Sequence, residues 1–190
     1  MARMVEVRWH GRGGQGAKTA AQLLAEAAIE EGSYGQAFPE YGPERTGAPV
    51  RAYTRISDAP IILHSPVKHP AIVMVLDQTL LDTVDVTEGM PEDGTLIVNT
   101  PQSPEQIRTR LGLTGRKIIT LNASQIAQET IGRPIPNTVM LGAFLRATGM
   151  LELDTVVADI EHKFARKFSR EISEANVRAI KRAYQEVQIG

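Results

Sequence analysis

A glycine-rich segment near the N-terminus constrains the fold of this chain more than any other feature. The stretch before it, residues 5–9, alternates in polarity and is rich in β-forming residues, which predicts a first strand. The stretch after it, residues 17–31, lacks glycine and proline and places small apolar residues at helical spacing. Between them, residues 11–16 match the pattern G-x-G-x-x-G. The sequence therefore predicts a strand, a glycine loop and a helix, as in a Rossmann-like domain.

Further along the chain, strand-like segments alternate with helix-like segments. Strands are predicted at residues 36–38, 50–57, 71–76, 95–99 and 117–121. Helices are predicted at residues 79–84, 104–111, 123–130, 137–148, 155–168 and 173–188, with Asn137 and Ser173 as candidate N-caps. We therefore expect an α/β fold with a doubly wound, mainly parallel sheet, helices on both faces and a helical C-terminal third. Residues 1–190 are expected to form a single domain.

Composition excludes several classes of function. The 190 residues include no cysteine, so the chain cannot form disulfides or supply thiolates to zinc or to iron–sulfur clusters. A formal net charge of -1 and 5% aromatic residues give no reason to expect nucleic acid as a partner. We see no membrane span and no secretory signal, and expect a cytoplasmic protein. The charges are uneven, because residues 77–105 contain acids but no Lys or Arg; solvated faces and docking surfaces both explain this.

The glycine loop suits a phosphate-bearing ligand. Glycines let the backbone approach a diphosphate, while the free N–H groups of the following helix face the anion. Arg12 and Lys18 add positive charge on either side of the loop. A tight turn that binds nothing is the alternative. A site for NAD is disfavoured, since the acidic residue expected after the second strand would be Glu40, which follows a proline and begins a long loop.

A second loop, residues 38–50, is far more distinctive. It reads FPEYGPERTGAPV, and with the glycine loop and the block PNTVMLG at residues 136–142 it resembles the gamma subunit of 2-oxoacid:ferredoxin oxidoreductases of the pyruvate-using type. The likeness extends over nearly the whole chain. One departure is Thr46, where members of this family often carry a second arginine.

The resemblance implies a division of labour within a complex. The complex converts a 2-oxoacid, expected to be pyruvate, and coenzyme A to an acyl-CoA and carbon dioxide, with electrons passing to ferredoxin. Thiamine diphosphate, magnesium and [4Fe-4S] clusters are expected on the alpha, beta and ferredoxin-like delta subunits. This chain is expected to bind none of these cofactors, to be inactive alone, and to help bind coenzyme A. The expected binding residues are Gly11, Arg12, Gly13, Gly14, Gln15, Gly16, Glu44, Arg45, Thr46 and Gly47.

Some residues and the function of the chain allow a second interpretation. The Arg45 guanidinium suits a phosphate, but an ion pair with Glu44 or Glu40 that stiffens the loop explains it equally well. Arg51 and Arg55 are expected to share one face of their strand. Two alternative functions for the chain remain: an independent NAD(P)-dependent dehydrogenase, and a purely structural subunit. No acid–base pair supports the first, and Ser124 and Ser173 have no base nearby that would make either a nucleophile.

Overall fold

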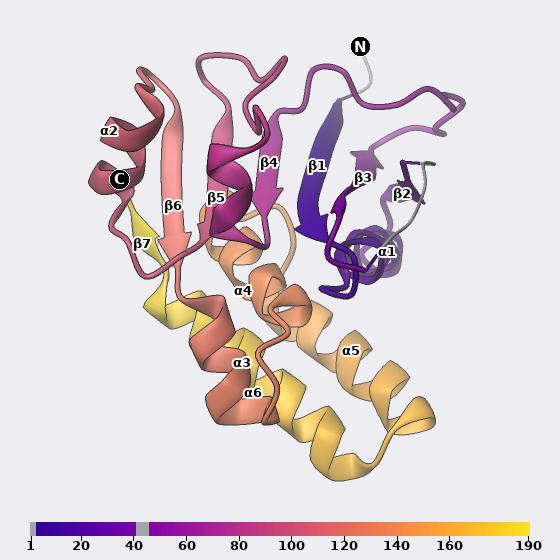
Figure 1. Cartoon of the computed structure of the whole chain (residues 1–190). Helices are drawn as coiled ribbons and strands as arrows, with labels where there is room; N and C mark the ends of the chain where they lie inside the picture. The colour runs from indigo at the N-terminus through magenta and orange to yellow at the C-terminus, as the bar shows by residue number, and fades with distance from the viewer. Residues whose placement is uncertain (1–2, 41–45) are drawn as a thin grey trace.

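The computed structural model describes residues 3–40 and 46–190, which form a seven-stranded sheet with helices on both faces (Figure 1). The strands are β1 (Met4–Arg12), β2 (Tyr34–Pro39), β3 (Pro49–Ser57), β4 (Ile72–Val75), β5 (Thr95–Asn99), β6 (Lys117–Leu121) and β7 (Gln188–Ile189). The helices are α1 (Ala17–Glu30), the 3-10 helix η1 (Gln78–Asp82), α2 (Pro104–Leu111), α3 (Ala123–Ile131), α4 (Asn137–Thr148), α5 (Leu153–Lys167) and α6 (Arg170–Glu186). The predicted α/β class and helical C-terminal third are confirmed.

The order of strands across the sheet is β2-β3-β1-β4-β5-β6-β7. Strands β1, β4, β5 and β6 are parallel to their neighbours in this series, and β2 runs in the same direction. Only β3 and β7 run the other way among the described strands. The sheet is therefore mainly parallel, as predicted, but the reversed strand β3 lies between β1 and β2. This insertion separates two strands that are adjacent in a standard dinucleotide-binding unit.

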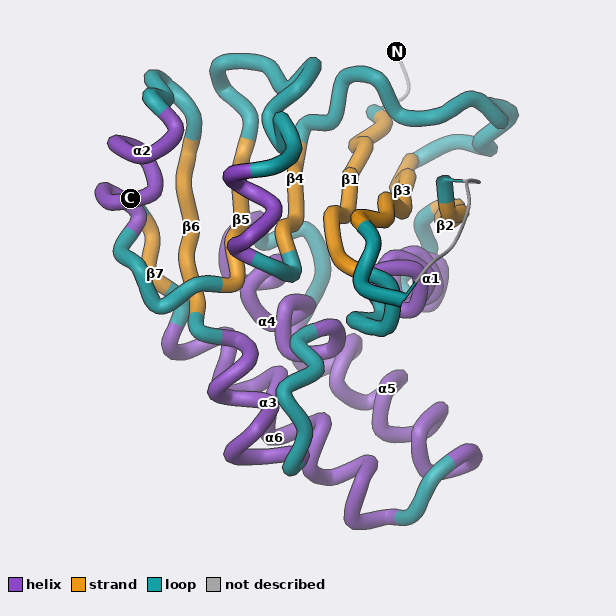
Figure 2. Tube along the Cα trace, viewed as in Figure 1, coloured by secondary structure: helices purple, strands orange, loops and turns teal. Residues whose placement is uncertain are grey.

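Two apolar cores lie on opposite faces of the sheet because side chains alternate along each strand. Ile72 and Met74 of β4 face a core that includes residues of α1, α3, α4, α5 and α6. Val73 and Val75 face a smaller core formed with η1, α2 and residues near them. Figure 2 shows the larger group of helices on one side, and a long loop that joins β3 to β4. The central strands are thus covered on both faces, which explains their continuous apolar runs.

The C-terminal helices pack closely because their contact residues are small. A Cβ atom on Gly142 of α4 would overlap the carbonyl oxygen of Ile180 in α6 and would lie 2.8 Å from the Cβ of Ala183. Gly142 therefore lets two helix backbones approach to a distance that a larger residue would forbid. This packing explains why the block at residues 136–142 ends in a glycine.

Two predicted helix caps are wrong. The N-cap of α6 is Ser169, whose side chain accepts from the backbone N–H of Ile172, whereas the buried Ser173 hydroxyl donates to the carbonyl oxygen of Glu161. Asn137 is the first residue of α4, and Pro136 occupies the N-cap position without a side-chain hydrogen bond. Asn137 is consequently available for contacts outside its own helix.

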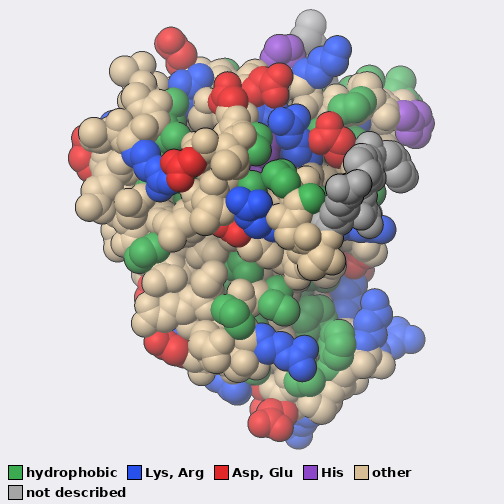
Figure 3. Space-filling model, in the orientation of Figure 1, with side chains coloured by type: hydrophobic (Ala, Val, Ile, Leu, Met, Phe, Trp, Pro, Cys, Tyr) green, Lys and Arg blue, Asp and Glu red, His purple; other side chains and the backbone are tan. Residues whose placement is uncertain are grey.

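Charged side chains of both signs are interspersed over the face seen in Figure 3. Several acids of the segment 77–105 pair with arginines from elsewhere: Asp82 with Arg110 at 2.6 Å, and Glu88 with Arg51 at 3.6 Å. These pairs favour solvated, locally compensated faces over a surface of one sign. Across the described residues, no helix combines the length and apolar character needed to cross a membrane.

Candidate functional site at the carboxyl edge of the sheet

Four parallel strands end at one edge of the sheet, where β1, β4, β5 and β6 lead into loops or helix starts. The chain leaves β1 through α1 toward β2 on one side, and β4 lies on the other side of β1. The direction of winding therefore reverses between β1 and β4. Ligands of open α/β sheets bind outside the carboxyl ends of the strands at such a reversal. The glycine loop lies at this point.

Two glycines of the loop adopt backbone conformations that other residues rarely take. Gly14 has φ of 96° and Gly16 has φ of 80°, both in the left-handed region. A Cβ atom on Gly14 would meet nothing within 4 Å among the described residues, so the space beside it is open. A Cβ atom on Gly16 would lie 2.5 Å from Nδ2 of Asn137. The start of α4 therefore lies against the loop at Gly16 and leaves the approach to Gly14 clear.

The glycine loop is hydrogen-bonded to the second loop. The Gly13 N–H donates to the Ala48 carbonyl at 2.9 Å, and the Gly47 N–H donates to the Gly13 carbonyl at 3.2 Å. The two loops therefore lie at one edge of the sheet for the described part of the second loop, where Thr46 and Gly47 are exposed. Glu44 and Arg45, two of the predicted binding residues, lie outside the described residues.

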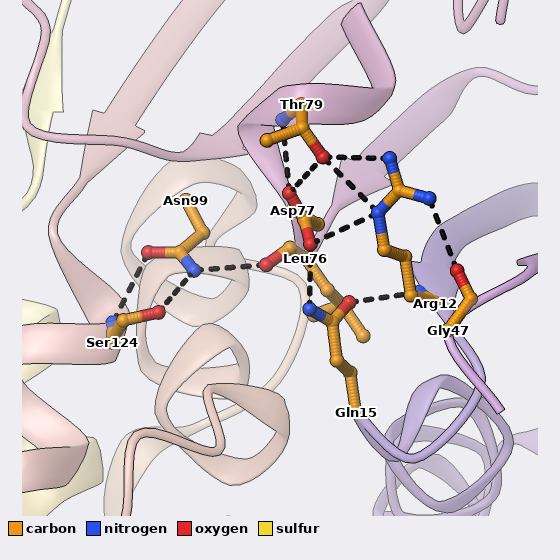
Figure 4. A network of polar contacts seen from close by, with 8 residues as sticks. All are labelled: Arg12, Gln15, Gly47, Leu76, Asp77, Thr79, Asn99 and Ser124. Atoms are coloured by element: carbon orange, nitrogen blue, oxygen red, sulfur yellow. Dashed lines mark hydrogen bonds and ion pairs between the residues drawn. The ribbon is translucent and has the colours of Figure 1, made fainter. Parts of the chain in front are cut away.

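Arg12 connects three segments at this edge (Figure 4). Its Nη1 donates to the Gly47 carbonyl at 3.1 Å, and its Nε and Nη2 donate to Oγ1 of Thr79 at 3.1 and 2.8 Å. Its Nε also lies 3.4 Å from Oδ2 of Asp77. A guanidinium has five N–H groups, and these contacts use three of them. Arg12 is therefore fixed in place, and its contacts within residues 3–40 and 46–190 leave some of its donors unused.

Asp77 follows β4 and receives hydrogen bonds from two directions (Figure 4). Its Oδ1 accepts from the N–H and the hydroxyl of Thr79 at 2.9 and 2.7 Å, and its Oδ2 accepts from Nε2 of Gln15 at 2.7 Å. Burial raises the pKa of Asp77, but the hydrogen bonds from Thr79 and Gln15 and the charge of Arg12 outweigh it, so the net pKa is lowered. Asp77 is therefore a stable carboxylate.

The side-chain amide of Gln15 is used within the protein. Its Oε1 accepts from the backbone N–H of Arg12 at 2.8 Å, while its Nε2 donates to Asp77. Gln15 was predicted to contact ligand, but its geometry assigns it to the support of the loop. The remaining predicted residue of β1, Gly11, is buried, and a Cβ there would lie 3.2 Å from Cδ1 of Leu76 and 3.3 Å from Cβ of Ala17.

The network continues beyond β4. Asn99, the last residue of β5, donates from Nδ2 to the Leu76 carbonyl at 2.9 Å and to Oγ of Ser124 at 2.8 Å. The Ser124 N–H donates to Oδ1 of Asn99 at 3.1 Å. The ends of β4 and β5 and the start of α3 are thereby joined. Ser124 has a structural role here, in agreement with the absence of a nucleophile motif.

Several donors at this edge have no partner within the described part of the chain. They are the backbone N–H groups of Gly14, Gly16, Ala17, Lys18 and Thr19. The last three belong to the first turn of α1, where the helix dipole adds partial positive charge. With the spare N–H groups of Arg12, they form an edge suited to an anion.

Of the two arginines of β3, Arg55 does not belong to this edge. Arg51 and Arg55 share a face, since they pair with His10 and Glu6 of β1 in an antiparallel ladder. Arg55 is 1% exposed, and its guanidinium bonds to Glu6 at 2.8 Å and to the carbonyl of Ser65 at 2.6 Å. It holds the loop after β3 and has no access to a ligand.

Asp77, Thr79, Asn99 and Ser124 are absent from the predicted site; of these, only Ser124 was considered, as a possible nucleophile. One signal could have indicated Asp77, because it follows a buried parallel strand and precedes Thr79 by two residues. Asp77 is the N-cap of η1, where its side chain accepts from the backbone N–H of Thr79. The contact with Gln15 could not be seen in the sequence, because 62 residues separate the two.

The fold and this edge define a Rossmann-like α/β domain with an anion-receptive glycine loop at the point where the sheet reverses its winding. A family model described as pyruvate ferredoxin/flavodoxin oxidoreductase matches residues 6–186. The chain therefore belongs to this family, and the expected gamma-type subunit of a 2-oxoacid:ferredoxin oxidoreductase is confirmed.

Individual relatives agree with this assignment. The chain is 52% identical over 183 residues to pyruvate synthase subunit PorC of Thermotoga maritima, covering 96% of this chain and 94% of the relative. It is 48% identical over 186 residues to the common gamma subunit of pyruvate/ketoisovalerate oxidoreductases of Pyrococcus abyssi, covering 98% of each. A crystal structure of pyruvate oxidoreductase subunit PORC from Thermotoga maritima matches with a TM-score of 0.87 and 47% identity, covering 99% of both chains.

Proposed function

We propose that this chain is the gamma subunit of a pyruvate-type complex and that its carboxyl edge binds the phosphate-bearing part of coenzyme A. The observation that carries the proposal is the set of backbone donors around Gly14 that have no partner among the described residues, next to an Arg12 whose contacts with those residues use only part of its N–H groups. A diphosphate accepts several hydrogen bonds and carries the charge that this edge favours. The open space beside Gly14 gives such a group room to approach the backbone.

The chemistry belongs to the partner subunits in this proposal. When bound, thiamine diphosphate with magnesium supplies decarboxylation of the 2-oxoacid, and [4Fe-4S] clusters supply electron transfer to ferredoxin. This chain has no cysteine to hold a cluster. Its residues hold coenzyme A at one end, so that the thiol end can reach the reacting group on the alpha and beta subunits. The delta subunit and external ferredoxin complete the proposed set of partners.

The substrate is proposed to be pyruvate, and its selection is assigned to other subunits. Two relatives support this: one is named for pyruvate synthase, and the other is named as common to pyruvate and ketoisovalerate oxidoreductases. A subunit shared between two substrates does not by itself discriminate between them. Both reactions would share coenzyme A, and this supports a role for the gamma subunit at coenzyme A.

A dinucleotide is a poorer ligand for this geometry. In a dinucleotide site, an acid after the strand adjacent to β1 bonds the ribose. Here β3 occupies that position, so Glu40 after β2 lies two strand spacings away, on the order of 10 Å. Glu40 also lies 3.7 Å from Arg51, which gives it a structural partner. The alternative of an NAD(P)-dependent dehydrogenase is therefore not favoured.

The proposal is tested on the assembled complex with Gly14→Val and Arg12→Ala. We expect each to raise the Kd and the KM for coenzyme A, on the order of tenfold, because one charge-assisted hydrogen bond or more is lost. The KM for pyruvate should stay near its original value. Gly112→Val is the matched control, since Gly112 also has positive φ and open space but caps α2, away from this edge.

The measurements are calorimetric titration of coenzyme A into the complex, and steady-state ferredoxin reduction. If both variants bind coenzyme A as the original complex does, the edge is not its site and the gamma subunit is a scaffold. If NADH or NADPH binds in its place, the dehydrogenase alternative is correct.

A further inference from the structure

We infer that Asp77 is a positioning residue for the anion site: it fixes the glycine loop through Gln15 and the Arg12 guanidinium through Thr79. The inference rests on the proposed binding of coenzyme A at this edge. Asp77 itself has no place among the contacts to ligand, because a carboxylate repels phosphate. Its effect on binding would come from the geometry that it imposes on groups that do carry donors.

Each oxygen of Asp77 holds a different segment (Figure 4). Oδ2 accepts from Gln15 Nε2 at 2.7 Å, and Oε1 of the same amide accepts from the Arg12 N–H at 2.8 Å. An amide cannot exchange these two ends, because one must donate to a carboxylate and the other must accept from an N–H. The Gln15 side chain is therefore locked in one orientation, and the loop between Arg12 and Gly16 is held on β4.

Oδ1 of Asp77 acts on the guanidinium. It accepts the hydroxyl hydrogen of Thr79 at 2.7 Å, which leaves the lone pairs of Thr79 Oγ1 directed to other donors. Nε and Nη2 of Arg12 occupy them at 3.1 and 2.8 Å. The Arg12 side chain is 28% exposed and would otherwise sample several rotamers in water. Asp77 thus sets both the direction of the guanidinium plane and the N–H groups that remain unused.

Hydrogen bonds of the neighbouring backbone also fix the position of Asp77. The carbonyl of the preceding residue, Leu76, accepts from Asn99, and the Leu76 N–H donates to the His10 carbonyl at 2.8 Å. The backbone at the end of β4 is therefore fixed to both neighbouring strands. Because all of these contacts are made between groups of the protein itself, they reduce the cost of ordering Arg12 for an anion.

The test uses the assembled complex with Asp77→Asn, Thr79→Val and Thr79→Ser, and with Arg12→Ala in parallel. Asp77→Asn is nearly isosteric but presents an NH₂ group to the Gln15 amide. Thr79→Val keeps the volume and loses the hydroxyl, while Thr79→Ser keeps the hydroxyl. Asp93→Asn is the control, since Asp93 is an exposed acid in the loop before β5, where the opposite edge of the sheet begins.

We expect Asp77→Asn and Thr79→Val to raise the KM and the Kd for coenzyme A, on the order of three- to tenfold. The KM for pyruvate and the kcat at saturating coenzyme A should change much less. Thr79→Ser should recover most of the affinity lost in Thr79→Val. A residue with a merely structural role would lower complex yield or kcat without this separation.

Two results would overturn the inference, and they are distinguishable. If Arg12→Ala weakens coenzyme A binding while Asp77→Asn and Thr79→Val bind normally, Asp77 does not position the site and the proposed function survives. If neither Arg12→Ala nor Asp77→Asn affects coenzyme A, the proposed function fails and the inference fails with it. Equal losses in Thr79→Ser and Thr79→Val would also refute the role of the hydroxyl.

Discussion

Acid should destabilise this protein through one buried histidine. His10 lies in β1, is 2% exposed, and accepts at Nε2 from Nε of Arg8 at 3.0 Å. Burial is the largest cause of a lowered pKa at His10, and the positive charges of Arg8 and Arg51 lower the pKa further, to about 3. The folded protein therefore keeps this imidazole neutral throughout the range in which a free histidine takes up a proton.

The sign and size of the effect follow from proton linkage. In the unfolded chain the pKa of His10 is about 6.5, so below that pH the unfolded state binds a proton that the folded state does not. Stability is unaffected by His10 above pH 6.5 and falls as the pH drops from there toward 3. The slope approaches about 1.4 kcal/mol per pH unit, which gives a loss of about 2 kcal/mol between pH 7.5 and pH 5. The pKa of Asp77 is lowered, so its contribution is lost only at more acidic pH.

Urea unfolding of the purified chain at pH 7.5 and pH 5 measures this loss directly. In His10→Gln the amide oxygen can still accept the hydrogen bond from Arg8, but the side chain has no proton to take up in this range. We therefore expect the loss of stability between the two pH values to shrink by more than half. His64→Gln is the control, because His64 is exposed and should leave the loss as in the original chain. If His10→Gln loses as much stability as the original chain, or if the original chain loses none, the assignment of a neutral buried imidazole is wrong.

Two further predictions concern the glycine loop and the cofactors. Gly16→Ala should destabilise the chain by about 1–3 kcal/mol, because a Cβ atom there would strain a left-handed backbone and press on Asn137. Adding Asn137→Ala should relieve the contact but not the backbone strain, so thermal unfolding should show only part of the lost stability restored. The isolated chain should show no visible absorption after iron–sulfur reconstitution, since it has no cysteine, and a stoichiometric cluster spectrum would contradict the proposed division of cofactors.

Local sequence patterns predicted most elements because the information for each lies within a few residues. Helices α2 and α4 begin and end at the predicted residues, and the three apolar runs became β4, β5 and β6. The glycine loop was recognised from its own residues and its neighbours. The two-residue strand β7 was missed, because it is defined by its pairing with β6 and not by a pattern of its own.

The candidate site was predicted only in part, since its support comes from distant residues. The sequence placed Arg12 and the glycines correctly at a sheet edge, but it could not show that Gln15 is held by Asp77. Likewise, Arg51 and Arg55 were correctly placed on one face, yet Glu6 and Ser65 bury Arg55 through contacts made by tertiary folding. Side-chain availability depends on these long-range partners, which no local pattern reports.

The position of β1 in the sheet has a consequence for folding during synthesis. It precedes the other strands of this sheet along the chain, so its neighbours β3 and β4 are both made after it. Strand β3 can then pair with one side of β1, and β4 can pair with its other side. Strands β5, β6 and β7 can each pair with the free edge of the strand made before it. Strand β2 is made before β3 but lies outside it in the sheet, so β2 must wait for β3 to join β1; in that sequence no strand inserts between two that are already paired, which avoids a slow rearrangement. Because α4 supplies the contact at Gly16, the glycine loop reaches its final surroundings only after residue 137 has emerged.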